Sequence, residues 1–267
     1  MEKTRPTVRF TAKPGEIVDD EVMEEGATLI HKLGPRAVTR LPGGIAKKWD
    51  LRNLEDEART MRVAESAGLP VPHVHGTGMS PMKKYWIAMD YIEGQTLAGA
   101  WNSYSKEEKS SVAKQLGEIL VKMRQMPPPE NHIGGAHVGD QGRDLVDYGL
   151  HVYPACKDEA EFNAHIVESM GVKKPKAFRR AIADQLRTDH RIVFTHGDLA
   201  LRNIIVQGPK VVSIIDWELG GWYPEYWDYA KCLCGIRASD FFDHADEIFP
   251  ESYPEELVTM TAHRIFQ

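Results

Sequence analysis

The polar residues with the greatest chemical potential lie between two short apolar runs in the last third of the sequence. Residues 194–206 read FTHGDLALRNIIV, so His196, Asp198 and Asn203 interrupt an otherwise apolar segment. Polar groups held near a core need hydrogen-bonding partners or a function. A further acid, Asp216, ends the next apolar run. This pattern predicts a loop that is fixed by its flanking strands and carries reactive side chains.

The turn signal at residues 207–210 separates two apolar runs, which are therefore expected to pair as a hairpin. Such a hairpin would bring Asn203, which precedes its first strand, close to Asp216, which follows its second. An amide oxygen and a carboxylate suit Mg²⁺, which uses few protein ligands and shares its remaining positions with phosphates. Asp198 is then left to orient or deprotonate a hydroxyl group. Together these are the parts needed for phosphoryl transfer.

The first third of the chain carries the elements expected to face this loop. Three short runs bounded by Gly and Pro predict strands over residues 27–33, 37–41 and 45–49. Apolar residues at helical spacing predict a helix over residues 54–67, which Gly68 can terminate. The aromatic run YWIAMDY, residues 85–91, predicts another strand.

The pattern becomes helical after residue 95. Helices are expected from the capping box at Ser105 to the prolines at 127–129, and over residues 159–170 and 176–186. Residues 131–147 are rich in Gly, His and Asp and are predicted to form a long loop. Because strands and helices are segregated along the chain, the sequence predicts an α+β fold with two lobes.

These motifs resemble those of a known family. Residues 196–203 match the H-x-D-x-x-x-x-N catalytic loop of kinase-fold enzymes, and the His-Gly-Asp form looks like the aminoglycoside phosphotransferase and choline kinase branch. The triplet Asp216-Trp-Glu resembles the metal-binding segment of that branch. Residues 221–231 are similar to the segment that follows it in fungal-type members. The resemblance to the aminoglycoside phosphotransferase family spans roughly residues 30–231.

The resemblance implies a two-lobed protein-kinase-like fold. Residues 1–92 would form the N-terminal, nucleotide-binding lobe, built on an antiparallel sheet. Residues 93–267 would form the mainly helical C-terminal lobe, which carries catalysis and acceptor binding. In the catalytic loop, Asp198 would be the catalytic aspartate, and Asn203 and Asp216 would hold Mg²⁺.

The N-terminal part fits the same family. Lys48 resembles the third-strand lysine that holds the α- and β-phosphates of the nucleotide. Lys47 is the alternative, because only one of two neighbouring strand residues can face the nucleotide. Glu57 lies in a D-E-A segment similar to that of the family's small-lobe helix, which implies that it pairs with the phosphate lysine.

Residues 86–94 look like the segment that leads into the hinge between the lobes. The resemblance implies that backbone groups of Asp90 and Ile92 bind adenine, with Met89 packing behind it. The loop that covers the phosphates should lie at residues 33–37, which read LGPRA without the G-x-G-x-x-G pattern. No phosphate contact is therefore assigned to that loop.

Four polar residues near the motifs have competing structural and functional interpretations. His196 is expected to orient the loop by hydrogen bonding, with a catalytic role as the alternative. Asp228 is expected to brace the catalytic loop, with substrate binding as the alternative. Glu218 is expected to be structural, with a contact to metal or substrate as the alternative. Arg202 is expected either to neutralise a phosphate or to pair with an acid.

Two further groups are expected to be structural. His73 and His75 lie on an extended segment without a third ligand, so a metal site is not expected there. A set of aromatic residues is expected to pack in the core: Trp217, Trp222, Tyr223, Tyr226 and Trp227. If these rings instead lined the acceptor pocket, they would favour a cationic or sugar-like acceptor.

Composition excludes several classes of protein. Of the 267 residues, 42% are hydrophobic and 27% charged, which is typical of a globular protein with a sizeable core. The net charge of −6 argues against a wide nucleic-acid footprint. Three cysteines without framework spacing argue against a secreted disulfide scaffold. Residues 1–16 do not resemble a signal peptide, and no apolar run is long enough to span a membrane.

The leading hypothesis is an ATP-dependent phosphotransferase that uses Mg²⁺ and transfers the γ-phosphate to a hydroxyl of a small molecule. GTP is the alternative nucleotide, and aminoglycosides, choline-like compounds and other alcohols are the candidate acceptors. A cytoplasmic monomer or weak homodimer without nucleic-acid or membrane partners is expected. One rival is a catalytically silent, kinase-like nucleotide-binding protein. Another is a metallophosphoesterase with His196 and Asp198 as metal ligands, although the downstream ligand motifs of that class are missing from the sequence.

Overall fold

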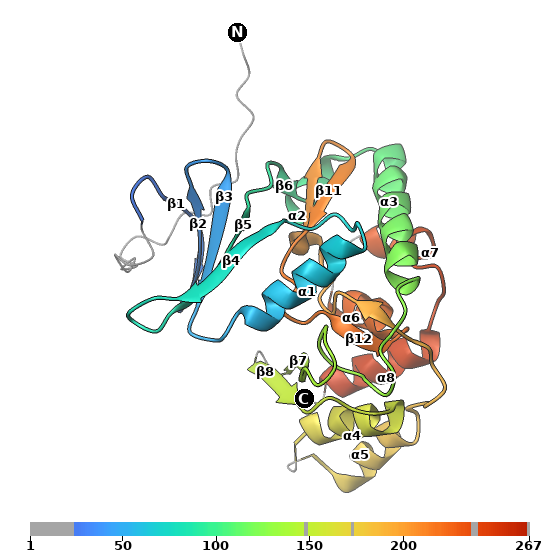
Figure 1. Cartoon of the computed structure of the whole chain (residues 1–267). Helices are drawn as coiled ribbons and strands as arrows, with labels where there is room; N and C mark the ends of the chain where they lie inside the picture. Colours follow the sequence, from blue (N-terminus) through green and yellow to red (C-terminus); the bar gives the residue numbers. More distant parts are fainter. Residues whose placement is uncertain (1–23, 147–148, 172–173, 236–239, 266–267) are drawn as a thin grey trace.

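A five-stranded antiparallel sheet forms the N-terminal part of the protein (Figure 1). Its strands are β1 (Thr28–Leu33), β2 (Arg36–Leu41), β3 (Ile45–Asp50), β4 (Val74–Met79) and β5 (Tyr85–Asp90), in the order β1-β2-β3-β5-β4. The computed structural model describes residues 24–146, 149–171, 174–235 and 240–265, so residues 1–16, where no signal peptide is expected, lie outside it. The four predicted strands are confirmed, and β4 adds a strand that the sequence pattern did not predict.

Helix α1 (Glu55–Ser66) crosses beside this sheet and confirms the helix predicted over residues 54–67 (Figure 1). Its first turn carries three acids, which the partial positive charge of a helix N-terminus favours. Its apolar face, including Met61, is buried. Gly68 follows with a φ of 67°, a left-handed conformation that glycine adopts without steric cost and that ends the helix.

The C-terminal part is mainly helical. Its α-helices are α2 (Leu97–Ala100), α3 (Lys106–Arg124), α4 (Glu159–Ser169), α5 (Lys176–Ala183), α6 (Trp227–Gly235), α7 (Ala245–Ile248) and α8 (Pro254–Ile265). Ser105 and Glu108 form the predicted capping box at the start of α3. The segregation of sheet and helices confirms the α+β class, whereas the lobe boundary at residue 92 stays a prediction.

Short strands connect the helical part to the catalytic loop. They are β6 (Gln95–Thr96), β9 (Ile192–Thr195), β10 (Ile204–Gln207), β11 (Lys210–Ile214) and β12 (Gly221–Pro224). Strands β10 and β11 form the predicted hairpin, in which Ile204 pairs with Ile214. Strand β9 pairs with β12, so strands on both sides of the loop anchor its ends.

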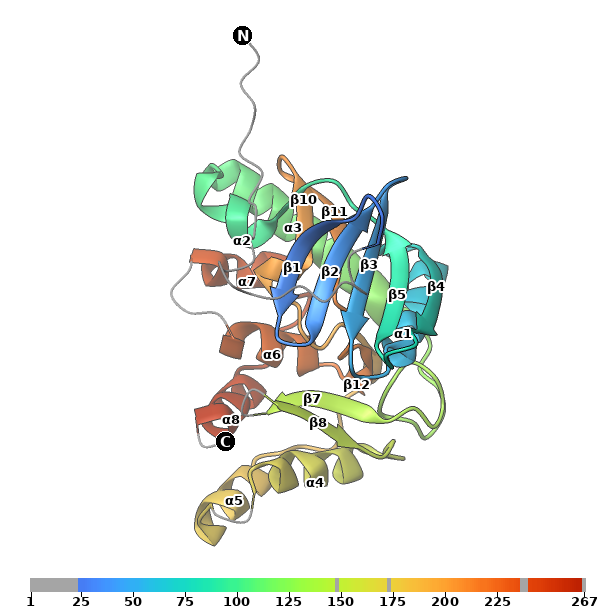
Figure 2. The ribbon, with the colours of Figure 1, turned by 90° about the vertical axis from the view of Figure 1, so that its left-hand side faces the viewer.

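The prediction of a long loop over residues 131–147 is wrong in its last part. Strand β7 (Gly142–Val146) pairs with β8 (Gly149–Tyr153) in an antiparallel hairpin. The hairpin lies below the end of the N-terminal sheet in Figure 2. The residues Gly142, Arg143 and Asp144 gave the start of β7 the composition of a loop, and a strand needs apolar residues only on the face that it buries.

The aromatic set of the sequence is core. The most exposed of its five members, Trp222, is only 4% exposed, so the packing interpretation holds and these rings do not line an open acceptor pocket. Trp217 packs against His196, with ring centroids 4.6 Å apart. The buried aromatic core therefore packs against the catalytic loop through Trp217.

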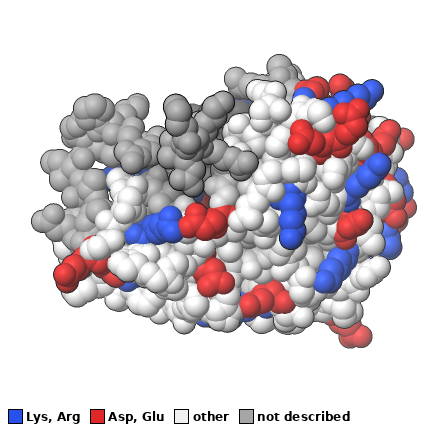
Figure 3. All heavy atoms as spheres, turned by 90° about the horizontal axis from the view of Figure 1, so that it is seen from above, with Lys and Arg blue, Asp and Glu red and all other residues white. Residues whose placement is uncertain are grey.

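None of the helices in the described part of the chain combines the length and the apolar character needed to cross a bilayer. On the face seen in Figure 3, the described Lys and Arg side chains are interspersed with Asp and Glu. Mixed charge of this kind creates no single-sign field over that face that would attract a polyanion. The expectation that the protein binds no nucleic acid stays a prediction.

Candidate active site

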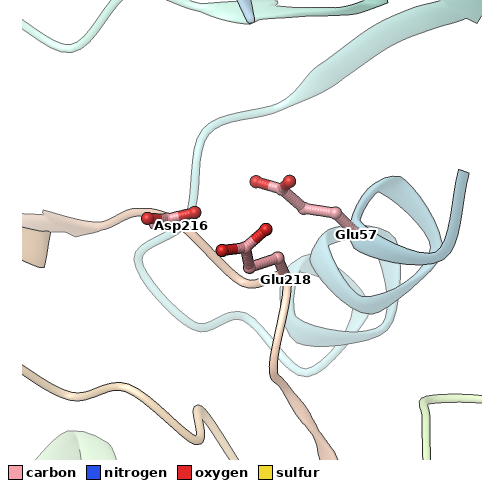
Figure 4. Close-up of side chains that lie close together, drawn as sticks. All are labelled: Glu57, Asp216 and Glu218. Atoms are coloured by element: carbon pink, nitrogen blue, oxygen red, sulfur yellow. The ribbon is translucent and has the colours of Figure 1, made fainter. Parts of the chain in front are cut away.

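Lys48 joins the N-terminal sheet to the segment after β11. Its Nζ lies 2.8 Å from Glu57 Oε2 on α1 and 2.6 Å from Asp216 Oδ1. Figure 4 shows the carboxylates of Glu57 and Asp216, with that of Glu218, turned toward one another. Burial alone would lower the pKa of Lys48, but Asp216 and Glu57 more than offset it and raise that pKa above its ordinary value. Lys48 is therefore a fixed cation that two acids hold in place.

Lys47 points to the opposite face of β3. Its Nζ lies 4.5 Å from the ring centroid of Trp49 and 4.3 Å from that of Trp86, and it also pairs with Glu24. Successive strand residues alternate between faces, so the two lysines cannot share a site. Lys48, rather than Lys47, lies with Glu57 and Asp216.

Asp216 adopts a φ of 66°, which is uncommon for a residue other than glycine. Burial would raise the pKa of Asp216, but the charge and hydrogen bond of Lys48 outweigh it and lower that pKa below its ordinary value. The carboxylate is thus ionised at neutral pH. An unusual backbone conformation that presents an ionised acid beside a lysine is typical of a functional site.

The buried carboxylate of Asp228 holds the start of the catalytic loop. Its oxygens accept the backbone N–H of His196 at 3.1 Å and that of Gly197 at 2.8 Å. Gly197 has a φ of 77°, and a Cβ there would lie 2.4 Å from Leu219 O, so only glycine fits. Asp228 therefore has the contacts of a brace for the loop.

Ile215, which precedes Asp216, anchors both ends of the loop. Its N–H donates to Asn203 O at 2.8 Å, and its carbonyl accepts from His196 Nε2 at 3.0 Å. The Nδ1 of His196 accepts the N–H of Asp198 at 3.2 Å. Both ring nitrogens are thus used within the loop, which matches the expected orienting role and leaves neither for a metal. This geometry removes the main support for a metallophosphoesterase.

Asp198 and Asn203 contact each other inside the loop. The Nδ2 of Asn203 donates to Asp198 Oδ2 at 3.0 Å and to Asp198 O at 2.8 Å. Arg202 also pairs with the Asp198 carboxylate. Because the amide nitrogen of Asn203 is committed to Asp198, its oxygen is the group left to bind a cation. An amide oxygen and an ionised carboxylate such as that of Asp216 are donor types that suit Mg²⁺.

Glu218 belongs to an ionic network that sequence reasoning missed. Its carboxylate lies 3.1 Å from Arg36 Nη1 and 2.8 Å from Arg52 Nη2, and both arginines also pair with Asp50. Burial raises the pKa of Glu218, although Lys48 opposes the shift. Arg36 lies in the LGPRA turn, where no phosphate contact had been assigned. A buried acid at the end of a strand, Asp50, was the available signal.

The predicted hinge residues lie at the end of β5. The Asp90 N–H donates to His73 O at 3.0 Å, and the Tyr91 N–H donates to Gly44 O at 2.7 Å. The N–H groups of Asp90 and Tyr91 are therefore already bonded. Met89 packs against the main core, behind these groups.

His73 and His75 lie next to the predicted hinge residue Asp90 and do not belong to the acid group around Lys48. His73 Nδ1 lies 2.7 Å from Glu65, and His75 Nε2 lies 2.8 Å from Asp90. Among the described His, Cys, Asp and Glu residues, the group close enough to share a cation is Glu57, Asp216 and Glu218. Lys48 occupies that group, and the histidines contribute nothing to it.

Replacement of Asp228 by Asn should destabilise the protein. The amide would keep one acceptor oxygen but turn its NH₂ toward a backbone N–H donor, which leaves a buried group unpaired. We expect a loss of about 1–3 kcal/mol in the free energy of unfolding, measured by urea denaturation. The control is Asp246→Asn, at an exposed acid, which should change little. Equal stability of both variants would contradict the bracing role.

A family model described as "Phosphotransferase enzyme family" matches residues 29–262. A search of the curated proteins found no match. Solved structures with a similar fold were found, however. Their sequence identity to this chain is low, so the likeness is evidence about the fold alone.

Three of these structures illustrate the likeness. Aminoglycoside-3'-phosphotransferase of type VIII is 15% identical, with a TM-score of 0.59 over 91% of this chain and 94% of the other. Aminoglycoside phosphotransferase APH(4)-Ia is 12% identical, with a TM-score of 0.65 over 90% and 83%. The streptomycin-ATP-APH(2")-IIa ternary complex is 12% identical, with a TM-score of 0.61 over 88% and 80%. These likenesses confirm the predicted kinase-like fold.

Proposed function

Because the chain belongs to the phosphotransferase enzyme family, we propose that it transfers the γ-phosphate of ATP to a hydroxyl group of a small molecule. GTP is the alternative nucleotide. Asp198 would be the catalytic residue, and Lys48, Glu57, Met89, Asp90 and Ile92 would bind the nucleotide. Asn203 and Asp216 would bind Mg²⁺.

The observation that carries this proposal is the double attachment of the catalytic loop to Ile215. His196 binds the carbonyl of Ile215 and Asn203 binds its N–H, so the loop is fixed relative to Asp216. Lys48 in turn joins Asp216 to the N-terminal sheet. These contacts connect the proposed catalytic base, the proposed metal-binding carboxylate and the proposed phosphate-binding cation, which supports the proposal. Phosphoryl transfer depends mainly on such positioning.

Each residue has a distinct role in the proposed reaction. The hinge positions adenine, and Lys48 binds the α- and β-phosphates while Glu57 keeps its ammonium in place. Bound Mg²⁺ would supply charge neutralisation at the phosphates. Asp198 orients the acceptor hydroxyl and accepts its proton as the oxygen attacks the γ-phosphorus. Arg202, paired with Asp198, limits the directions that the carboxylate can take.

Ligands of structurally similar proteins support the proposed substrates. Their structures include complexes with ATP and streptomycin, with GDP, and with ADP and hygromycin B. These ligands belong to those proteins, and they support the proposal that this chain uses a nucleotide and a small acceptor. The rival proposal is a protein that binds a nucleotide without catalysing transfer. The presence of Asp198, Asn203 and Asp216 at the motif positions for catalysis and metal binding disfavours it.

Loss of the Asn203 oxygen should weaken metal binding. In Asn203→Ala we expect the magnesium concentration for half-maximal ADP formation to rise about tenfold or more. Asn102→Ala, at an exposed amide, is the matched control and should leave the magnesium dependence unchanged. Chelation of magnesium should stop ADP formation by the wild type. An unaltered magnesium midpoint in Asn203→Ala would contradict the assignment.

We propose a cytoplasmic protein that acts as a monomer or weak homodimer on small molecules. The measurement for assembly is sedimentation at several concentrations. A tight dimer at all of them would overturn that part of the proposal and leave the reaction untouched.

A further inference from the structure

A cavity of about 300 Å³ opens between the start of α1 and the β7–β8 hairpin. Glu57 and Glu218 line it on the side of the active site, and Leu150 and Val152 line it from β8. Because Glu57 binds Lys48, the cavity adjoins the phosphate end of the proposed nucleotide site rather than the hinge. Figure 2 shows the hairpin below the end of the sheet that carries the β1–β2 turn, in agreement with this placement.

Arg143, on β7, also lines the cavity and has unused hydrogen-bonding capacity. Its Nη2 pairs with Asp56, and no other side-chain acceptor for its guanidinium is found among the described residues. A guanidinium has five N–H donors in a fixed fork. Only 16% of this side chain is exposed, and Nη2 is the guanidinium nitrogen that bonds a side-chain acceptor in the described part of the chain, so the other nitrogens stay open to a ligand. Burial also lowers the pKa of Arg143, the sign of a charged group short of compensation.

The acids of the cavity are already neutralised. Glu57 pairs with Lys48, and Glu218 pairs with Arg36 and Arg52. Arg143 therefore offers the cavity guanidinium donors that its ion pair with Asp56 does not use. A carboxylate or phosphate matches an arginine fork with two parallel hydrogen bonds.

The β8 wall adds an apolar requirement. Leu150 and Val152 are two residues apart on a strand, so both lie on the face toward the cavity. Val152 is 40% exposed, which is high for a large aliphatic side chain and leaves it available for contact. A ligand for this cavity would place carbon groups against these two side chains.

We propose that this cavity binds the acceptor, and that the acceptor is a small hydroxyl compound with a carboxylate or phosphate group on an aliphatic skeleton. This inference rests on the proposed function. Arg143 binds the anion, and the hydroxyl points toward the nucleotide. The bond between the γ-phosphorus and its bridging oxygen breaks as the acceptor oxygen binds the phosphorus. The hydroxyl proton passes to Asp198, and the products are ADP and a phosphate ester.

A matched series of four-carbon alcohols tests the inference by binding. The probes are hydroxybutyrate, hydroxybutyl phosphate, butanediol and aminobutanol, titrated calorimetrically in the presence of magnesium and a non-hydrolysable ATP analogue. We expect at least one of the two acids to bind about tenfold or more tighter than the diol and the amine. The carboxylate and phosphate arms then identify which anion the site accepts.

Variants locate the preference. Arg143→Gln should remove the advantage of the acids, whereas Arg180→Gln, at a side chain 84% exposed on α5, should keep it. Val152→Asp, at an accessible position, should weaken the acids but not the diol, which guards against misfolding of Arg143→Gln. Equal binding of all four probes, tighter binding of the amine, or an unchanged preference in Arg143→Gln would overturn the inference.

Turnover separates this inference from the proposed function. ADP formation that depends on Asp198 but uses a neutral or cationic acceptor would overturn the acid-acceptor assignment and keep the phosphotransferase. Selective binding of the acids through Arg143, with no ADP formation from any acceptor, would keep the anion site and overturn the phosphotransferase.

Discussion

Replacement of Asp198 by Asn should lower the rate of phosphoryl transfer by about 10²–10⁴-fold. The amide cannot accept the hydroxyl proton, although it has nearly the same size and can still bind Asn203 Nδ2. The carboxylate is held within a loop anchored at both ends, so the variant should fold normally. Nucleotide affinity should stay within about twofold of the wild type, because Asp198 acts on the acceptor rather than on the nucleotide.

The control for Asp198 is Asp243→Asn, which makes the same chemical change at an exposed acid. The rate of ADP formation at saturating ATP and acceptor is the measurement, with nucleotide binding followed separately by calorimetry. If Asp198→Asn keeps more than about a tenth of the wild-type rate, another group carries the proton and the catalytic assignment fails.

Replacement of Lys48 by Met should reduce both stability and nucleotide binding. The variant leaves Glu57, 1% exposed, without its cation and removes the partner of Asp216. Removal of one partner from a buried ion pair typically costs about 3–5 kcal/mol of the free energy of unfolding. Urea denaturation measures that cost, and calorimetry measures the accompanying loss of ATP affinity.

The double variant Lys48→Met/Glu57→Gln separates structure from function. It should recover much of the stability, because the buried side chain at position 57 is then uncharged and no longer needs a cation. It should not recover ATP binding. Lys47→Met is the matched control on the opposite face of β3 and should keep ATP affinity. Loss of ATP affinity in Lys47→Met, with normal affinity in Lys48→Met, would reverse the assignment of the two lysines.

Sequence reasoning reached the parts of the site that local pattern determines. Two apolar runs and a turn predicted the β10–β11 hairpin. Ile204 pairs with Ile214 in it, so Asn203, before the first strand, and Asp216, after the second, both flank its open end. Alternation along β3 required that Lys47 and Lys48 face opposite sides but could not decide which one faces the site. In the structure Lys47 lies over the rings of Trp49 and Trp86, whereas Lys48 pairs with Glu57 and Asp216. Trp86 and Asp216 are distant from β3 in the sequence, so local pattern could not supply these contacts.

The features that sequence reasoning missed depend on long-range contacts. Arg36 and Glu218 are separated by 182 positions, and nothing near either residue indicates the other. Strand β7 begins Gly-Arg-Asp within a segment rich in Gly, His and Asp, so its pairing with β8 could not be read from strand propensity alone. Arg143 acquired a proposed role only when that hairpin placed it beside a cavity. Residue types thus indicated the proposed reaction, whereas the proposed acceptor pocket required the tertiary arrangement.

The most direct test of the central proposal is to follow the γ-phosphate itself. Purified protein is incubated with magnesium, ATP and the acceptor that binds best, and the products are resolved by phosphorus NMR. We predict equimolar ADP and a phosphate ester of the acceptor, both absent with Asp198→Asn. Conversion of ATP to ADP and inorganic phosphate without an ester, or a phosphate ester formed equally by Asp198→Asn, would contradict the proposed transfer.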